Sequence, residues 1–350
     1  MRREPPPAIR QTKDKRPMAF SSTRSDTRLF DRALLARRRA RALAAPLRGA
    51  DFLLQSVVED MADRLAITMR EFGTAVALGD VTGLSTAMLR ASPKVGTVLR
   101  ADGLVAGTGP GRADLIVDEE ALPFAEASLD LVVSPLALQF VNDLPGALVQ
   151  IRRALRPDGL LLAAFLGGDT LFELRQVLME AEIAEGGGAS PRVLPVAEVR
   201  DAGGLLQRAG FALPVTDRDR LTVRYDTMFD LIRDLRAMGA TNILTARDRR
   251  PPARRLFLTA AELYADRFAD PDGRVRATFD IISISGWAPD PSQQKPLAPG
   301  SAKMRLADAL QTQEISATEK AAPGSAPRSA PKQDPSSADR APGSRSDRTS

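Results

Sequence analysis

The stretch Thr74-Ala75-Val76-Ala77-Leu78-Gly79-Asp80-Val81-Thr82-Gly83 decides the fold. Its first half is a short apolar run, typical of a buried strand, and the residues from Gly83 through Leu89 have a helical pattern. Open α/β proteins bind ligands at such strand-to-helix turns, along the carboxyl edge of a parallel sheet. Gly79 and Gly83 would let a ligand approach the main chain, although such a turn also forms merely to pack a strand against a helix.

The same alternation of strand and helix continues on both sides of this stretch. Asp51 stands at the N-cap position of a predicted helix over 52–69, and a helix over 144–156 ends before Pro157-Asp158-Gly159. Further strands are predicted at 95–99, 114–117, 129–133 and 160–166. Strands that alternate with helices indicate a doubly wound α/β fold, with a mostly parallel sheet covered on both faces.

The chain beyond this region is less regular. Its patterns predict helices over 169–184 and 196–209, strands near 211–216 and 220–225, and two more helices. The segment from Val275 to Ile281 alternates and is rich in strand-forming residues, so we expect an antiparallel edge strand at 275–285.

Both ends of the chain differ in composition from the middle. Residues 1–28 and 311–350 are rich in Pro, Ser, Arg, Lys and Gln and poor in apolar residues. Such segments cannot offset the entropy of ordering. We therefore predict a disordered basic arm over 1–28, a single domain over 29–310, and a disordered low-complexity tail over 311–350.

Composition limits the chemistry of the chain. The 350 residues include no histidine and no cysteine, which excludes Ser-His-Asp triads, thiolate nucleophiles and the zinc and iron sites built on those ligands, so no metal site is expected. The net charge is +5, but residues 1–50 carry +10 and the remainder −5, so the body of the protein is not a predicted nucleic-acid binder. The basic cluster Arg37-Arg38-Arg39-Ala40-Arg41 is interpreted as the solvated face of a helix, with acidic lipid or RNA as the alternative contact. No apolar stretch approaches the ~20 residues of a membrane span.

Acidic residues follow the ends of two further predicted strands. Asp102 lies 19 residues after Gly83, at the end of the second strand, where an acid binds a ribose hydroxyl in nucleotide-binding α/β folds. Asp118 and Glu119 end the third strand, where acids could accept from an adenine amino group. Each acid alone would ordinarily be a solvated loop residue, but their order favours a nucleoside-bearing ligand.

Longer segments carry a family resemblance. They are the turn at 78–83, Asp102, the segments 118–124, 129–134 and 155–160, and then Gly167-Gly168-Asp169-Thr170-Leu171 and Gly286-Trp287-Ala288-Pro289. In these motifs the chain resembles class I S-adenosylmethionine-dependent methyltransferases, in the branch of malonyl-carrier-protein O-methyltransferase and mitochondrial complex I assembly factor 5. The resemblance spans about 29–310. It implies a seven-stranded Rossmann-like sheet built from 52–166 and 205–285, with helical insertions at 169–204 and 226–270 that form a lid.

The resemblance also implies the site. Its cofactor would be S-adenosylmethionine, bound by Gly79, Asp80, Thr82, Gly83, Asp102, Asp118, Glu119 and Ser134. Gln139 is a candidate acceptor-binding residue, and so are Arg175, Arg192 and Arg224, because a guanidinium can grip a carboxylate at two points. No catalytic residue is assigned.

Three positions depart from the family pattern. Ala77 stands where the family has an acid for the cofactor's ammonium, Val81 replaces a glycine, and Gln139-Phe140-Val141-Asn142-Asp143 takes the place of a His-Trp pair. A methyltransferase tolerates the absence of a base, because the sulfonium is already an activated donor and positioning supplies much of the acceleration.

Two activities follow from the resemblance. One is methyl transfer to a small-molecule, carrier-protein or protein acceptor by a cytoplasmic protein. The alternative is hydroxylation of an arginine in a respiratory complex I subunit, or a non-enzymatic assembly role that binds such a client. Nucleic acid is not an expected partner, and no membrane span is expected in the chain.

Overall fold

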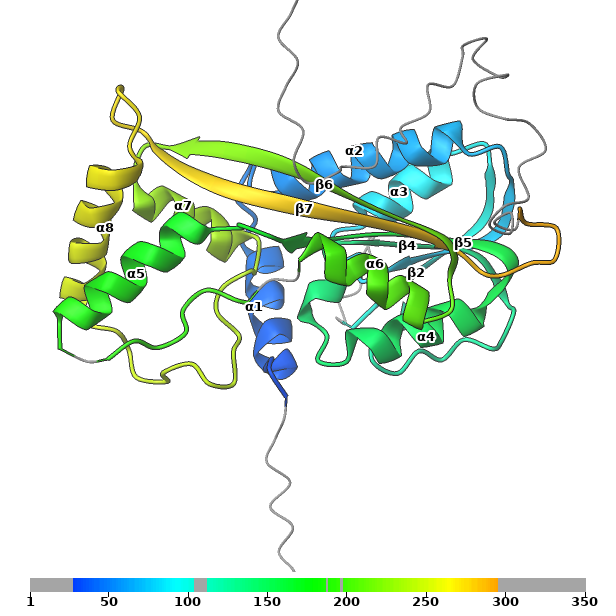
Figure 1. The fold of residues 1–350 in the computed structure, drawn as a ribbon, viewed down its shortest axis with the longest axis horizontal. Coiled ribbons are helices and arrows are strands. Elements are labelled where there is room, and N and C mark those ends of the chain that lie inside the picture. The colour runs from blue at the N-terminus through cyan, green and yellow to red at the C-terminus, as the bar shows by residue number, and fades with distance from the viewer. Residues whose placement is uncertain (1–27, 104–111, 187, 196–197, 295–350) are drawn as a thin grey trace, which may run out of the picture. The chain divides into compact units, whose positions relative to one another are not determined.

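The computed structural model describes residues 28–103, 112–186, 188–195 and 198–294 (Figure 1). Its helices are α1 (Arg32–Ala44), α2 (Phe52–Ile67), α3 (Leu84–Ala91), the short 3-10 helix η1 (Leu138–Phe140), α4 (Leu144–Ala154), α5 (Phe172–Ala184), α6 (Val199–Arg208), α7 (Met228–Ala237) and α8 (Arg254–Phe268). Its strands are β1 (Phe72–Leu78), β2 (Val95–Asp102), β3 (Leu115–Ile116), β4 (Leu129–Pro135), β5 (Leu155–Gly167), β6 (Ala212–Tyr225) and β7 (Val275–Trp287).

The strands of the described part form one seven-stranded sheet in the order β3-β2-β1-β4-β5-β7-β6. The first five are parallel, whereas β7 runs antiparallel to both β5 and β6. The predicted doubly wound, mostly parallel sheet is therefore confirmed. The parallel strands bring the ends of β1, β2 and β4 to one edge, where the strand order places β1 between the other two.

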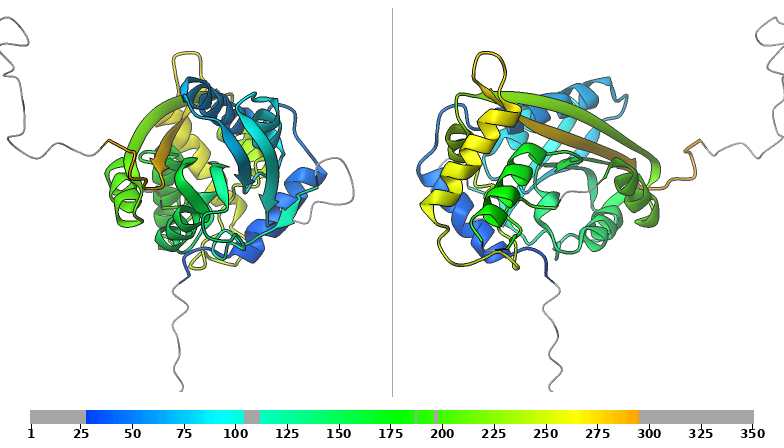
Figure 2. Two further views of the ribbon diagram at one scale, coloured as in Figure 1. Left: turned by 90° about the vertical axis from the view of Figure 1, so that its right-hand side faces the viewer. Right: turned by 60° about the vertical axis from the view of Figure 1, so that its left-hand side comes forward.

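Helices cover both faces of this sheet (Figures 1 and 2). On one face the apolar residues of α2 and α3 pack with β1 and β4, and α5, α7 and α8 continue the same core cluster. On the other face α4 and α6 pack against alternate residues of the same strands. Apolar burial on two faces explains why β1, β4 and β5 are nearly continuous apolar runs.

Two predictions about the antiparallel part are wrong. The expected strands 211–216 and 220–225 are one strand, β6, because Asp217 to Arg220 stay paired with β7. The segment 275–285 belongs to β7, which lies between β5 and β6, so β6 is the edge strand instead. A charged stretch is tolerated in β6 because its outer side faces water.

The predicted arm 1–28 and tail 311–350 lie outside the described residues, apart from residue 28. Within the described residues, none of the helices has the length and apolar character needed to cross a membrane.

Candidate functional site

The glycine turn, Gly79–Gly83, connects β1 to α3. Gly79 and Gly83 adopt positive φ angles of 71° and 85°, which favour glycine. A Cβ on Gly79 would lie 2.3 Å from the Cβ of Ala137, so no larger residue fits there. From β2, the buried Arg100 donates its Nε to the Asp80 carbonyl at 2.8 Å and its Nη2 to the Val81 carbonyl at 2.7 Å. Arg100 thereby holds the turn against β2.

Asp80 uses its buried carboxylate to cap α3. Its Oδ1 accepts from Gly83 N at 3.1 Å, and its Oδ2 accepts from Thr86 N at 2.8 Å and from Thr86 Oγ1 at 2.6 Å. These bonds satisfy main-chain donors that a helix start leaves without partners. The carboxylate is therefore committed to the fold, although Asp80 borders the cavity described next.

A first cavity of about 710 Å³ opens at the glycine turn. Its walls come from the end of α1, the segment 46–55, the turn itself, the ends of β4 and β5, η1 and the end of α7. Of the predicted cofactor residues, Gly79, Asp80 and Thr82 border it, and so does the acceptor candidate Gln139. The size and mostly apolar lining are typical of a small-molecule site.

The remaining predicted cofactor residues do not line the first cavity. Gly83 packs toward Arg100, and the fully buried Ser134 donates its hydroxyl to the Leu78 carbonyl at 3.0 Å. Asp102 is buried at the end of β2. None of these three residues, nor Asp118 or Glu119, is among the described residues that border the first cavity.

Arg32 of α1 forms ion pairs with both Asp118 and Glu119. Burial by itself lowers the pKa of Arg32, but Glu119 and Asp118 outweigh it and raise that pKa. Burial likewise raises the pKa of Asp118, while the Glu120 N–H and Arg32 more than compensate and lower it below its ordinary range. The two acids expected to contact adenine are thus held by a cation from the N-terminal helix.

The basic cluster of α1 does not form a uniformly solvated face, so that interpretation is wrong for two of its arginines. Arg37 and Arg41 are exposed, but Arg38 is half-buried and donates to the Asn242 carbonyl. Arg39 borders the first cavity with its guanidinium 5.0 Å from the centre of the Phe140 ring, a cation–π contact. Burial lowers the pKa of Arg39, and Glu119 and Asp102 act in the opposite direction.

A second cavity, of about 1000 Å³, adjoins the first. The two share Ala42, Leu47, Gln139, Phe140, Leu166, Ala237 and Ala240. Apolar residues of α5 and α7 form much of its wall, and the charged residues around it are Arg38, Arg41, Arg192, Arg233, Arg236, Arg247, Asp248, Arg249 and Arg250. A cavity with eight arginines and one acid is suited to an anionic ligand.

The four candidate acceptor-binding residues do not lie at one site. Gln139 borders both cavities, and Arg192 borders the second while pairing with Glu182 at 2.5 Å. Arg175 is not among the residues that border either cavity but donates to the carbonyl of Thr170, which does border the second. Arg224 lies at the far end of β6 in ion pairs with Asp270 and Asp272.

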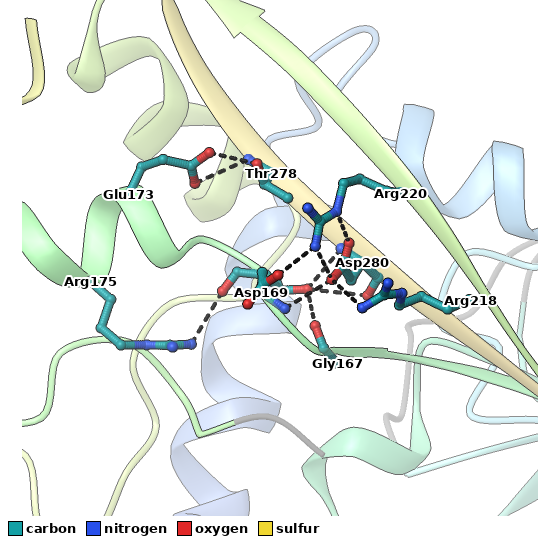
Figure 3. A network of polar contacts seen from close by, with 9 residues as sticks. Gly167, Asp169, Glu173, Arg175, Arg218, Arg220, Thr278 and Asp280 are labelled. Atoms are coloured by element: carbon teal, nitrogen blue, oxygen red, sulfur yellow. Dashed lines mark hydrogen bonds and ion pairs between the residues drawn. The ribbon is translucent and has the colours of Figure 1, made fainter. Parts of the chain in front are cut away.

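A polar network fixes the turn after β5 against β6 and β7 (Figure 3). The fully buried Asp280 accepts from Arg220 Nε at 2.7 Å, from Arg220 Nη2 at 2.9 Å and from Asp169 N at 2.9 Å. Burial raises the pKa of Asp280, but the bonds from Arg220 and Asp169 N outweigh it and lower that pKa. Thr170 and Leu171, which follow in this turn, border the second cavity.

Comparisons with known proteins decide the family. A protein-family model described as "Methyltransferase domain" matches residues 82–163. The chain is 37% identical over 303 residues to "Arginine-hydroxylase NDUFAF5, mitochondrial" of Danio rerio, an alignment that covers 82% of this chain and 91% of the relative. It is 34% identical over 300 residues to "Malonyl-[acyl-carrier protein] O-methyltransferase" of Laribacter hongkongensis, which covers 81% and 95%. The chain belongs to the class I S-adenosylmethionine-dependent methyltransferase family.

The cofactor of this family is S-adenosylmethionine, and the cavity at the glycine turn fits it. Gly79 to Thr82 border the cavity, and at Gly79, which has no side chain, a ligand can approach the main chain closely. Asp102 is the last residue of β2, and Asp118 and Glu119 come soon after β3, in the order that the methyltransferase resemblance implies. Sequence reasoning missed the contribution of α1: the arginine cluster was visible, but nothing local showed that Arg32 and Arg39 turn toward the site.

Proposed function

We propose that this protein transfers a methyl group from S-adenosylmethionine to a carboxylate on an acceptor that enters through the second cavity. The observation that carries the proposal is the junction of the two cavities. One contains the glycine turn and the other is surrounded by arginines, and they meet at Gln139, Phe140 and Leu166. A donor site and an anion site that share a wall can bring two reactants together.

The chain's own residues would hold the cofactor. The Gly79–Gly83 turn would face its methionine and ribose parts, Asp102 would accept from the ribose hydroxyls, and Asp118 with Glu119 would face the adenine. When bound, the cofactor supplies a methyl group already activated by a sulfonium. Because Arg32 pairs with both Asp118 and Glu119, contact between these acids and adenine requires that they share or release this arginine.

The second cavity would orient the acceptor. Arg41, Arg236, Arg249 and Arg250 are exposed, and no carboxylate in the described part of the chain pairs with them. An ionised carboxylate needs no general base to attack a methyl group, which agrees with a chain that has no histidine and no cysteine. The Oε1 of Gln139 accepts a hydrogen bond from Leu166 N at 3.1 Å. Its amide NH₂ group is not used in this bond and would be the part of Gln139 that donates to an acceptor where the two cavities meet.

The acceptor class is a small molecule, a carrier protein or another protein. The relatives named malonyl-carrier-protein methyltransferases support a carboxylate on a carrier protein, and their bacterial sources support work in the cytoplasm. A second candidate is arginine hydroxylation, or assembly of respiratory complex I through a bound client, which the name of the NDUFAF5 relatives favours.

Mass spectrometry of acceptors incubated with the protein and S-adenosylmethionine tests the proposal. We expect an added methyl group that mild base removes, as from an ester, and formation of S-adenosylhomocysteine. The double variant Arg236→Ala/Arg249→Ala should raise KM, while Arg255→Ala, an exposed arginine of α8 outside both cavities, should not. An added oxygen atom on an arginine, with no methyl transfer, would support the second candidate and refute the first.

A further inference from the structure

The proposed cofactor would bring a positively charged group into the first cavity. The methionine part of the proposed cofactor has an ammonium group beside a carboxylate, and an ammonium in a confined site needs an anionic partner. Ala77, at the position where the family resemblance implies that acid, is completely buried in the apolar core and offers none. The partner must come from another element.

Two acids are found among the described residues that border the first cavity, Asp51 and Asp80. Asp80 already accepts from Gly83, Ser85 and Thr86, so its oxygens are used by the start of α3. Asp51 is therefore the carboxylate that remains for a ligand in this cavity.

Asp51 immediately precedes α2 but does not act as an ordinary N-cap. Its side chain makes no capping hydrogen bond to the helix. Within the described part of the chain, its Oδ2 accepts from Gln55 Nε2 at 2.8 Å, and Gln55 borders the same cavity. One oxygen of the carboxylate is thus held in place by a neutral donor, and no cation in the described part of the chain forms an ion pair with it.

The packing of α2 places this acid on the appropriate side of the sheet. Leu53 and Val57 of α2 belong to the same core cluster as Ala77, so α2 covers the face of β1 to which residue 77 belongs. The helix begins beside the glycine turn, because Asp51, Leu53 and Gln55 border the cavity together with Gly79 and Val81. Arg48, three residues before Asp51, also borders the cavity and brings a charge of opposite sign.

We propose that Asp51 binds the ammonium group of the cofactor's methionine part, replacing the acid that is absent at Ala77, and that Gln55 orients its carboxylate. The inference rests on the proposed function, since it assumes that S-adenosylmethionine occupies the first cavity.

Isothermal titration with three ligands tests this assignment. S-adenosylmethionine and S-adenosylhomocysteine carry the ammonium, whereas methylthioadenosine keeps the nucleoside and lacks the amino-acid part. Asp51→Asn should weaken both ammonium-bearing ligands by about ten- to a hundredfold, the usual effect of one charged hydrogen bond, and leave methylthioadenosine within about twofold. Asp51→Glu should restore most of the loss. Asp63→Asn, an exposed acid on the same helix, is the matched control and should change nothing.

Each other outcome overturns a defined part of the account. Unchanged binding of S-adenosylhomocysteine by Asp51→Asn would remove Asp51 from the site. An equal loss for all three ligands would show a damaged cavity rather than a lost ammonium contact, and would also overturn the assignment. If the unaltered protein bound none of the ligands, the proposed function itself would fail, and this inference with it.

Discussion

The buried carboxylate of Asp280 provides a sharp test of how the turn beside the second cavity is held. It accepts three hydrogen bonds, two from Arg220 and one from Asp169 N, and Arg218 lies 3.8 Å away. In Asp280→Asn the shape is nearly kept, but the charge is lost and an amide NH₂ replaces one accepting oxygen. At least one of the three donors then faces another donor.

The magnitude follows from these contacts. Hydrogen bonds to a charged group contribute about 1.5–3 kcal/mol. Because the Arg220 side chain is 46% exposed, water screens the pair and can solvate the released guanidinium. We therefore expect a loss of about 2 kcal/mol, equivalent to a drop of roughly 1 M in the urea midpoint.

Urea unfolding followed by circular dichroism provides the assay. The control is Asp169→Asn: this side chain is 59% exposed and pairs with the same Arg220, so its loss should cost less than about 1 kcal/mol. A carboxyl group whose pKa is lowered by folding stabilises above its unfolded pKa, about 3.9, and this contribution is lost as the pH falls through the folded value. The gap between Asp280→Asn and the unaltered protein should thus shrink below about pH 4. Equal midpoints for the Asp280 and Asp169 variants at neutral pH would refute the reasoning.

Three further predictions concern Arg32 of α1 and two predicted cofactor residues, Asp80 and Asp102. Arg32→Ala should reduce hydrogen-exchange protection of α1, because the helix loses its ion pairs to Asp118 and Glu119, whereas Arg37→Ala should not; equal protection in both variants would contradict this anchoring role. Asp80→Ala should lower thermal stability by the 0.5–2 kcal/mol or so of a lost helix cap, and an unchanged melting temperature would show that the cap is dispensable. Asp102→Ala should weaken S-adenosylmethionine binding by about ten- to a hundredfold in titration calorimetry, and full affinity would exclude Asp102 from the site.

The parallel half of the fold was predictable from sequence for a physical reason. Strands buried on both faces are short apolar runs, and β1 is followed by the glycine turn. Local pattern therefore located β1, β2 and β4 to within a few residues. It placed the start of β5 five residues late, because Pro157-Asp158-Gly159 resembles a turn but lies inside the strand, which begins at Leu155. The glycine turn was equally visible, since positive φ at Gly79 and Gly83 depends on residue type.

The antiparallel half and the role of α1 depend on contacts distant in sequence. From sequence alone, the charged segment of β6 has the composition of a turn. It is part of a strand because Asp280, 60 residues later, accepts a hydrogen bond from Arg220. Arg32 likewise meets Asp118 from 86 residues away, so its helix appeared amphipathic with an exposed basic face. Local patterns identify such residues as charged but do not show which side chains they will meet.

The most direct test of the central claim is isothermal titration of the full chain with S-adenosylmethionine, repeated with Gly79→Val, whose added side chain would collide with Ala137 beside the first cavity. The account predicts saturable binding of one cofactor per chain, and a large loss of affinity in a variant whose circular dichroism spectrum shows that it still folds. Absence of binding by the unaltered protein, or equal affinity in the variant, would contradict a cofactor site at the glycine turn.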